Sequence, residues 1–261
     1  MGNIGSKSQR DRATIGAVRL LGLECADLSA AAAASAIAQR PADTPFGYVV
    51  TPNADHFMRL ARNPELRTLY EDAWIRLLDS RVVARAARLL GLRAPLVAPG
   101  SDVAALLLER HLYADEPVTI IGLRPEWVDN LRRRYHLTNI AHHNPPMGFE
   151  HDAVAFQRAV EFALSHPARF IFLTTGSPRQ ELLASAIATT GQGRGTGLCV
   201  GAALEFLSGA KTRAPRWMQH AGVEWLHRLG SDPRRMIRRY LWDDAMIFRL
   251  LLQDRITARS R

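Results

Sequence analysis

Asp79 is the residue whose type and position most directly indicate chemistry. It follows the apolar run Trp74–Leu78 and precedes a segment of helical periodicity that begins at Ser80 and Arg81. A carboxylate at the mouth of a sheet can take a proton from a hydroxyl nucleophile, as a general base. Capping of the following helix is the alternative explanation. Arg81 and the arginines after it would let an anionic ligand share a cleft with that base.

Thr51 and Asn53 close another apolar run, at residues 47–50, and lead into a helix that is expected near Ala54. A threonine hydroxyl and an asparagine amide at the end of a strand can bind a sugar or a base. Helix capping, which both residue types often perform, is the simpler interpretation from the local sequence alone.

A third strand ends in the sequence TTGSPRQE, residues 174–181, where the chain breaks at Gly176 and a helix is expected from Pro178. The free backbone N–H groups and the positive dipole end at a helix start attract anions. The spacings of a phosphate-binding P-loop and of a dinucleotide-binding fingerprint are both absent. The turn through Gly176 and Ser177 is therefore a candidate contact for an anionic ligand.

Alternating strands and helices must position these candidate site residues. Apolar runs of strand length alternate with stretches of helical period, which predicts a layered, Rossmann-like α/β domain with a largely parallel sheet. In such sheets ligands bind at the carboxyl ends of the strands. The expected strands are Val18–Leu23, Phe46–Thr51, Trp74–Leu78, Pro117–Gly122, Thr138–His142, Arg169–Thr174 and Gly197–Val200. The main expected helices are Ser80–Leu92, Asp102–Tyr113, Pro125–Tyr135, Asp152–Ser165, Pro178–Thr189 and Ala202–Ser208.

The charge divides the 261 residues into two parts. The chain has 34 Lys and Arg against 25 Asp and Glu, a net charge of +9. Residues 211–261 hold 12 of these cations and 5 of the anions, so the tail is basic and the rest is nearly neutral. We therefore expect a flexible N-terminus at 1–14, an α/β domain at 15–210 and a helical, arginine-rich appendage at 211–261. A basic amphipathic helix favours a membrane surface, and a solvated face packed on the body is the alternative.

Several classes of site are not indicated. Cys25 and Cys199 match no redox or metal spacing and are expected to be buried. Two aspartates never stand two residues apart, and the histidines do not have the spacing of zinc ligands. No apolar stretch is long enough to span a bilayer. These observations predict a cytoplasmic protein that needs no metal and no other cofactor.

Taken in order, four segments resemble the WecG/TagA/CpsF family of bacterial glycosyltransferases, glycosyltransferase family 26, over roughly residues 15–245. They are TPNADHFMRLAR, the Asp79 strand end, GSPRQELL, and a C-terminal signature with APRW, EWLHRL and RRYL. The resemblance implies inverting, metal-independent transfer of a hexose-type sugar from a UDP-sugar donor to a polyprenyl-diphosphate-linked sugar acceptor, in surface or exopolysaccharide synthesis. The enzyme would act at the inner face of the cell membrane.

The resemblance also implies roles for individual residues. Asp79 corresponds to the catalytic base, Thr51 and Asn53 to pocket residues, and Gln180 to the glutamine of a substrate-binding motif. Ser177 and Glu181 in that motif, and Arg81 beside the base, join the candidate substrate contacts. The arginine-rich tail of the family, which completes the site and binds anionic membrane, corresponds to Arg213, Arg216, Arg228, Arg235, Arg238 and Arg239. A homo-oligomer is also possible.

Some positions depart from the family pattern. Ser80 stands where a glycine is common, Leu173–Pro178 replaces a more glycine-rich strand end, and Glu205 replaces a frequent aspartate. The donor sugar is therefore open, and the segment 143–150 slightly favours a glucose or uronic-type donor over N-acetylmannosamine. The alternative functions are a basic nucleic-acid-binding protein and a nucleotide-dependent oxidoreductase. The first would bind with steep salt dependence, and the second lacks its glycine fingerprint.

Overall fold

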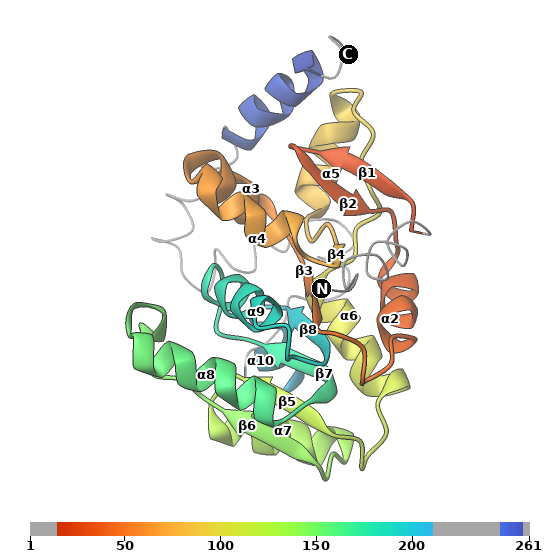
Figure 1. Ribbon diagram of the computed structural model, residues 1–261. Coiled ribbons are helices and arrows are strands. Elements are labelled where there is room, and N and C mark those ends of the chain that lie inside the picture. Colours follow the sequence, from red (N-terminus) through yellow and green to blue (C-terminus); the bar gives the residue numbers. More distant parts are fainter. Residues whose placement is uncertain (1–14, 211–245, 258–261) are drawn as a thin grey trace.

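A six-stranded parallel sheet forms the centre of the protein (Figure 1), as the alternating pattern predicts. The computed structural model describes residues 15–210 and 246–257. The strand order is β4-β3-β8-β7-β5-β6, and every neighbouring pair is parallel. The strands are β3 (Gly47–Val50), β4 (Ile75–Arg76), β5 (Val118–Ile121), β6 (Ile140–His143), β7 (Ala168–Leu173) and β8 (Gly195–Cys199). All the residues of β5 and β8 are buried, because helices cover both faces of the sheet.

The helices form two layers around this sheet. Val50, Leu173 and Cys199 point into the core under one layer, whereas Val49, Phe172 and Leu198 point into the core under the other. The first layer is formed by α3 (Ala54–Arg62), α4 (Thr68–Glu71), α5 (Arg81–Leu89), α8 (Ala153–Ser165) and α9 (Arg179–Thr189). The second is formed by α2 (Ala30–Ala38), α6 (Gly100–Leu106), α7 (Pro125–Tyr135) and α10 (Ala203–Leu207). Short helical turns complete the order: η1 (Pro64–Arg67), η2 (Leu107–His111) and η3 (Phe149–His151).

The expected strand Val18–Leu23 is wrong. The chain turns at Leu21 and Gly22 and makes an antiparallel hairpin of β1 (Ala17–Leu20) and β2 (Leu23–Ala26), separate from the main sheet. The φ angles of the two turn residues are 51° and 79°, a region that glycine adopts easily and that tight hairpin turns require. The apolar run conceals this turn because Leu21 itself is apolar.

A helix at residues 246–257 packs on the same side of the body as the hairpin (Figure 1). Ile247 and Leu251 are buried in the core under the first helix layer. Asp254 accepts a hydrogen bond of 2.8 Å from the backbone N–H of Leu21 through Oδ2. The appendage expected at 211–261 is thus helical in its last part, and this part shares a core with the body. The boundary at residue 210 stays a prediction.

Candidate active site

Thr51 lies at the carboxyl end of β3, between the end of β8 and the start of α6. Its hydroxyl donates to the carbonyl oxygen of Cys199 over 3.2 Å. A Cβ atom at Gly100 would stand 3.0 Å from Oγ1 of Thr51, so the absence of a side chain at Gly100 permits this close approach. Thr51 is buried and makes no helix cap, so the capping interpretation is wrong for this residue.

Asp79 lies beside the same helix start, the amino end of α6 at Gly100. Its backbone N–H donates to the carbonyl oxygen of Pro52 over 2.9 Å, which ties the segment after β4 to the segment after β3. Its Oδ2 accepts from the backbone N–H of Gly100 over 3.2 Å. Ser80, not Asp79, caps α5. The carboxylate therefore lies at the positive end of α6, which favours a negative charge.

Asn53 caps α3, as the local sequence suggests. Its Oδ1 accepts from the backbone N–H groups of Asp55 and His56 at 3.0 and 3.4 Å. The Nδ1 atom of His56 lies 3.2 Å from the backbone nitrogen of Asn53 and 2.7 Å from its Oδ1. The two side chains form a reciprocal capping box. His56 was missed in the sequence, although its place three residues after the cap was a readable signal.

The turn through Gly176 and Ser177 precedes α9 and carries a nearby cation. Gly176 has a φ angle of 81°, and the Ser177–Pro178 peptide bond is cis. Arg59 of α3 donates from Nη1 to the Ser177 hydroxyl oxygen over 2.6 Å, and the Tyr70 hydroxyl lies 3.4 Å from the same atom. The positive charge of Arg59 thus lies beside a helix N-terminus. In the sequence, the one sign that Arg59 belongs to the site is its position on the same helical face as Asn53 and His56. No local pattern indicates Tyr70.

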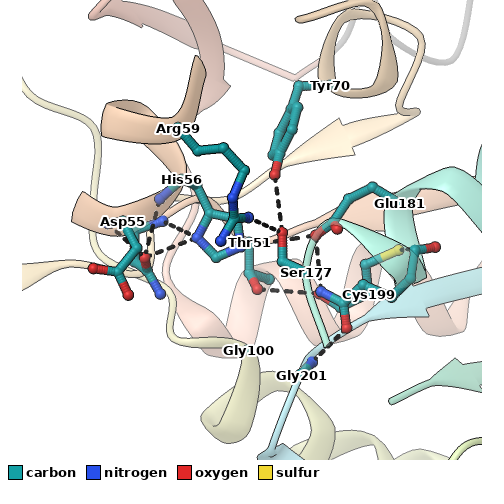
Figure 2. Close-up of polar contacts among 12 residues, drawn as sticks. Thr51, Asp55, His56, Arg59, Tyr70, Gly100, Ser177, Glu181, Cys199 and Gly201 are labelled. Carbon is teal, nitrogen blue, oxygen red and sulfur yellow. Dashed lines mark hydrogen bonds and ion pairs between the residues drawn. The ribbon is translucent and has the colours of Figure 1, made fainter. Parts of the chain in front are cut away.

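Gln180 and Glu181 are buried beneath this turn, with exposed fractions of 2% and 0%. Gln180 accepts from the backbone N–H of Gly201 over 2.9 Å and donates from Nε2 to Oε1 of Glu181 over 2.8 Å. Figure 2 shows the Glu181 side chain pointing toward His56, whose Nε2 lies 3.8 Å from Oε1 of Glu181. Burial raises the pKa of Glu181, and hydrogen bonds from Gln180 and Ser177 and the charge of Arg59 offset that rise only in part.

The remaining sequence candidates are Arg81 and the arginines of the tail. Arg81 is the first residue of α5, two positions after Asp79, and is half-buried. The six tail arginines, at 213, 216, 228, 235, 238 and 239, lie outside the residues that the structure describes. Their proposed contacts stay predictions.

The side chains of the two adjacent histidines of β6 have different neighbours. His142 places Nε2 3.0 Å from the carbonyl oxygen of Gly122, whereas His143 packs on Phe162 with a ring separation of 5.2 Å. Burial lowers the pKa of His143. Over residues 15–210 and 246–257, His, Cys, Asp and Glu side chains nowhere gather in groups of three or more that could hold a metal ion. Metal independence itself stays a prediction.

The fold is that of an α/β protein with a parallel sheet, a class in which ligands bind at the carboxyl ends of the strands. The sequence model of the glycosyl transferase WecG/TagA/CpsF family matches residues 18–261. The chain belongs to this family, and its role is that of a glycosyltransferase with a sugar donor and an acceptor. This membership favours a transferase over the nucleic-acid-binding and oxidoreductase alternatives. In the described part of the chain, the helices are too short or too polar to cross a membrane.

Proposed function

We propose that the protein is an inverting glycosyltransferase that moves a hexose-type sugar from a UDP-sugar to a polyprenyl-diphosphate-linked sugar acceptor. The observation that carries this proposal is the meeting of Asp79, Thr51 and Gly100 at one edge of the sheet. A carboxylate beside the start of α6 and a buried hydroxyl 3.0 Å from the place of a Gly100 side chain form one polar corner.

In the proposed reaction Asp79 takes the proton of the acceptor hydroxyl. The acceptor oxygen attacks the anomeric carbon of the donor, the bond from that carbon to the UDP oxygen breaks, and UDP leaves with the bonding electrons. One displacement inverts the anomeric centre. Thr51 and Asn53 are proposed as contacts to the sugar or the acceptor, on the side of the corner where both follow β3.

The leaving UDP carries negative charge that must be stabilised. The start of α9, with Gly176, Ser177 and the adjacent Arg59, supplies backbone N–H groups and one cation there. We include Gln180, Arg81 and the tail arginines in the proposed donor-binding set. No metal is required in this proposal, because these groups would supply the positive charge.

A peripheral location on the inner face of the cytoplasmic membrane is proposed from the charge of residues 211–261. Each basic residue near an anionic surface contributes about 1 kcal/mol of attraction. The helix at 246–257 also exposes Phe248, Leu252 and Ile256, which share one face at a spacing of four residues. A lipid-linked acceptor, with use in surface or exopolysaccharide synthesis, fits such a location. A glucose or uronic-type donor is the preferred choice.

The test is a panel of UDP-sugars assayed for UDP release with a lipid-diphosphate sugar acceptor, with and without chelator. We expect turnover that chelator does not reduce. Asp79→Asn should lower kcat by about 10²- to 10⁴-fold, the usual contribution of a general base. The variant should unfold at the temperature of the wild type. Full activity of Asp79→Asn would remove Asp79 from the role of base.

A further inference from the structure

Glu181 is the most deeply buried acidic side chain of this edge, and it lacks a strong cationic partner. Its exposed fraction is 0%. Among the described residues, His56 alone comes within ion-pair distance, at 3.8 Å, which is too long for a hydrogen bond. No described group donates to or accepts from its Oε2. A buried ionised carboxylate in these surroundings would be costly.

The carboxyl group nevertheless joins three segments that the proposed reaction needs. Through Gln180 it reaches the backbone N–H of Gly201 after β8. Through His56 it reaches Asn53, the cap of α3. Because the neighbouring Pro52 accepts from the N–H of Asp79, the second path ends beside the proposed base.

We infer that Glu181 is a positioning residue whose buried carboxyl group, in its neutral form, holds the Gln180 amide in place beside the His56–Asn53 cap. This inference rests on the proposed function for its catalytic consequence. It gives Glu181 a different role from the substrate contact expected from the sequence.

The orientation of the Gln180 amide depends on this group. Oε1 of Glu181 accepts from Nε2 of Gln180, so the amide oxygen faces Gly201 and accepts its N–H. Loss of the acceptor would leave that amide free to turn. The end of β8 carries the Cys199 carbonyl that holds Thr51, so the loop and the Thr51 hydroxyl would move together.

The neutral form follows from the geometry of the pair. Nδ1 of His56 accepts from the backbone N–H of Asn53 at 3.2 Å in one ring tautomer and donates to Oδ1 of Asn53 at 2.7 Å in the other. Among the described residues, an ionised Glu181 would have only the His56 ring as an ion-pair partner, and Nε2 of that ring lies 3.8 Å from Oε1. The charged alternative gains no direct hydrogen bond at 3.8 Å, so burial favours the neutral imidazole and the neutral carboxyl group.

This arrangement predicts a pH dependence of stability. Burial raises the pKa of Glu181 above its ordinary value of 4.5, so the folded protein binds the proton more tightly than the unfolded chain. The resulting stabilisation is complete below pH 4.5 and is lost as the pH rises through the folded pKa. The charged or titratable groups that face Glu181 are His56 and Arg59 from α3, Tyr70 from α4, Tyr48 from β3 and Cys199 from β8.

The test compares the wild type with Glu181→Gln, Glu181→Ala and a matched control, Glu161→Gln, at an exposed position of α8. Glutamine copies the neutral carboxyl group and cannot ionise. We expect Glu181→Gln to keep kcat within about threefold at pH 6 and Glu181→Ala to lose at least about tenfold, in kcat more than in donor KM. The ratio of Glu181→Gln to wild-type kcat should rise with pH, whereas Glu161→Gln should follow the wild type.

A second arm measures unfolding free energy by urea at several pH values, without substrate. Relative to Glu181→Gln, the wild type should lose stability as the pH rises. Equal losses of activity in Glu181→Gln and Glu181→Ala at every pH would overturn the inference, as would wild-type activity in Glu181→Ala. If Glu181→Ala does not fold, the pH dependence of kcat and of unfolding free energy in Glu181→Gln, relative to the wild type, tests the inference instead. Absence of turnover in the wild type would refute the proposed function, and a flat unfolding profile would still refute the neutral carboxyl group.

Discussion

The amino and carboxyl ends of the parallel sheet differ in how many hydrogen bonds and ion pairs surround their buried ionisable side chains. At the amino ends, Arg40 is 8% exposed and donates to the carbonyl oxygens of Pro45 and Gly195 while its guanidinium lies 5.0 Å from the ring centre of Trp74. Arg169 there pairs with Glu116 at 2.6 Å. At the carboxyl ends, Glu181 is buried without such a partner among the described residues, and Asp79 accepts a backbone hydrogen bond of 3.2 Å from the start of α6.

We interpret this difference as a division of roles, in which the amino ends stabilise the fold and the carboxyl ends form the site. Several bonds to each charge at the amino ends offset the cost of burial, so those charges hold the sheet together. At the carboxyl ends, polar side chains from several separate segments gather at one edge, where a ligand can contact them together. Substitutions at the two ends should therefore have opposite profiles of stability and activity.

Arg40→Leu should have the largest effect on stability in this comparison. It leaves the carbonyl oxygens of Pro45 and Gly195 without their donor, which should lower the unfolding free energy by about 3 kcal/mol. Activity per folded molecule should not change. Urea denaturation with Arg158→Leu, at an exposed position of α8, as the control measures this. A loss of kcat without a loss of stability would contradict the proposed division.

Arg59→Met should show the reverse profile. Methionine keeps the length and packing of the side chain but removes the charge beside the Ser177 hydroxyl. The KM for the UDP-sugar should rise about tenfold, equivalent to about 1.4 kcal/mol of binding free energy. Calorimetry with UDP provides a reading that is independent of turnover. Unchanged UDP affinity, alongside an unchanged Arg158→Met control, would remove Arg59 from the donor site.

Thr51→Val and Thr119→Val form the smallest and most closely matched comparison. The Thr51 hydroxyl donates to the backbone carbonyl oxygen of Cys199 at the carboxyl end of the sheet. The Thr119 hydroxyl, in the amino half of β5, donates to the backbone carbonyl oxygen of His166 over 2.6 Å. Each variant should lose about 1 kcal/mol of unfolding free energy. Only Thr51→Val should also lower kcat/KM, by about fivefold. Equal activity of both variants would show that the Thr51 hydroxyl serves the fold alone.

The sequence predicted the alternation of strands and helices and the polar residues at the strand ends. It failed where a contact between distant residues decided the outcome. The hairpin at Leu21 depends on a positive φ angle, and its N–H is satisfied by Asp254 from the other end of the chain. Arg59 and Tyr70 reach Ser177 across more than 100 residues, so no local pattern marked them.

Local rules thus decided the fold class, the capping by Asn53 and the placement of Asp79 after a strand, because periodicity and turn residues act over a few positions. The tertiary structure alone decided that Asp79 and Thr51 meet at Gly100, and that Glu181 of α9 is fully buried beside His56 of α3. The physical reason is the strand order β4-β3-β8, which brings three separate strand ends to one edge. Burial depends on everything packed around a side chain, which a single segment of sequence does not specify.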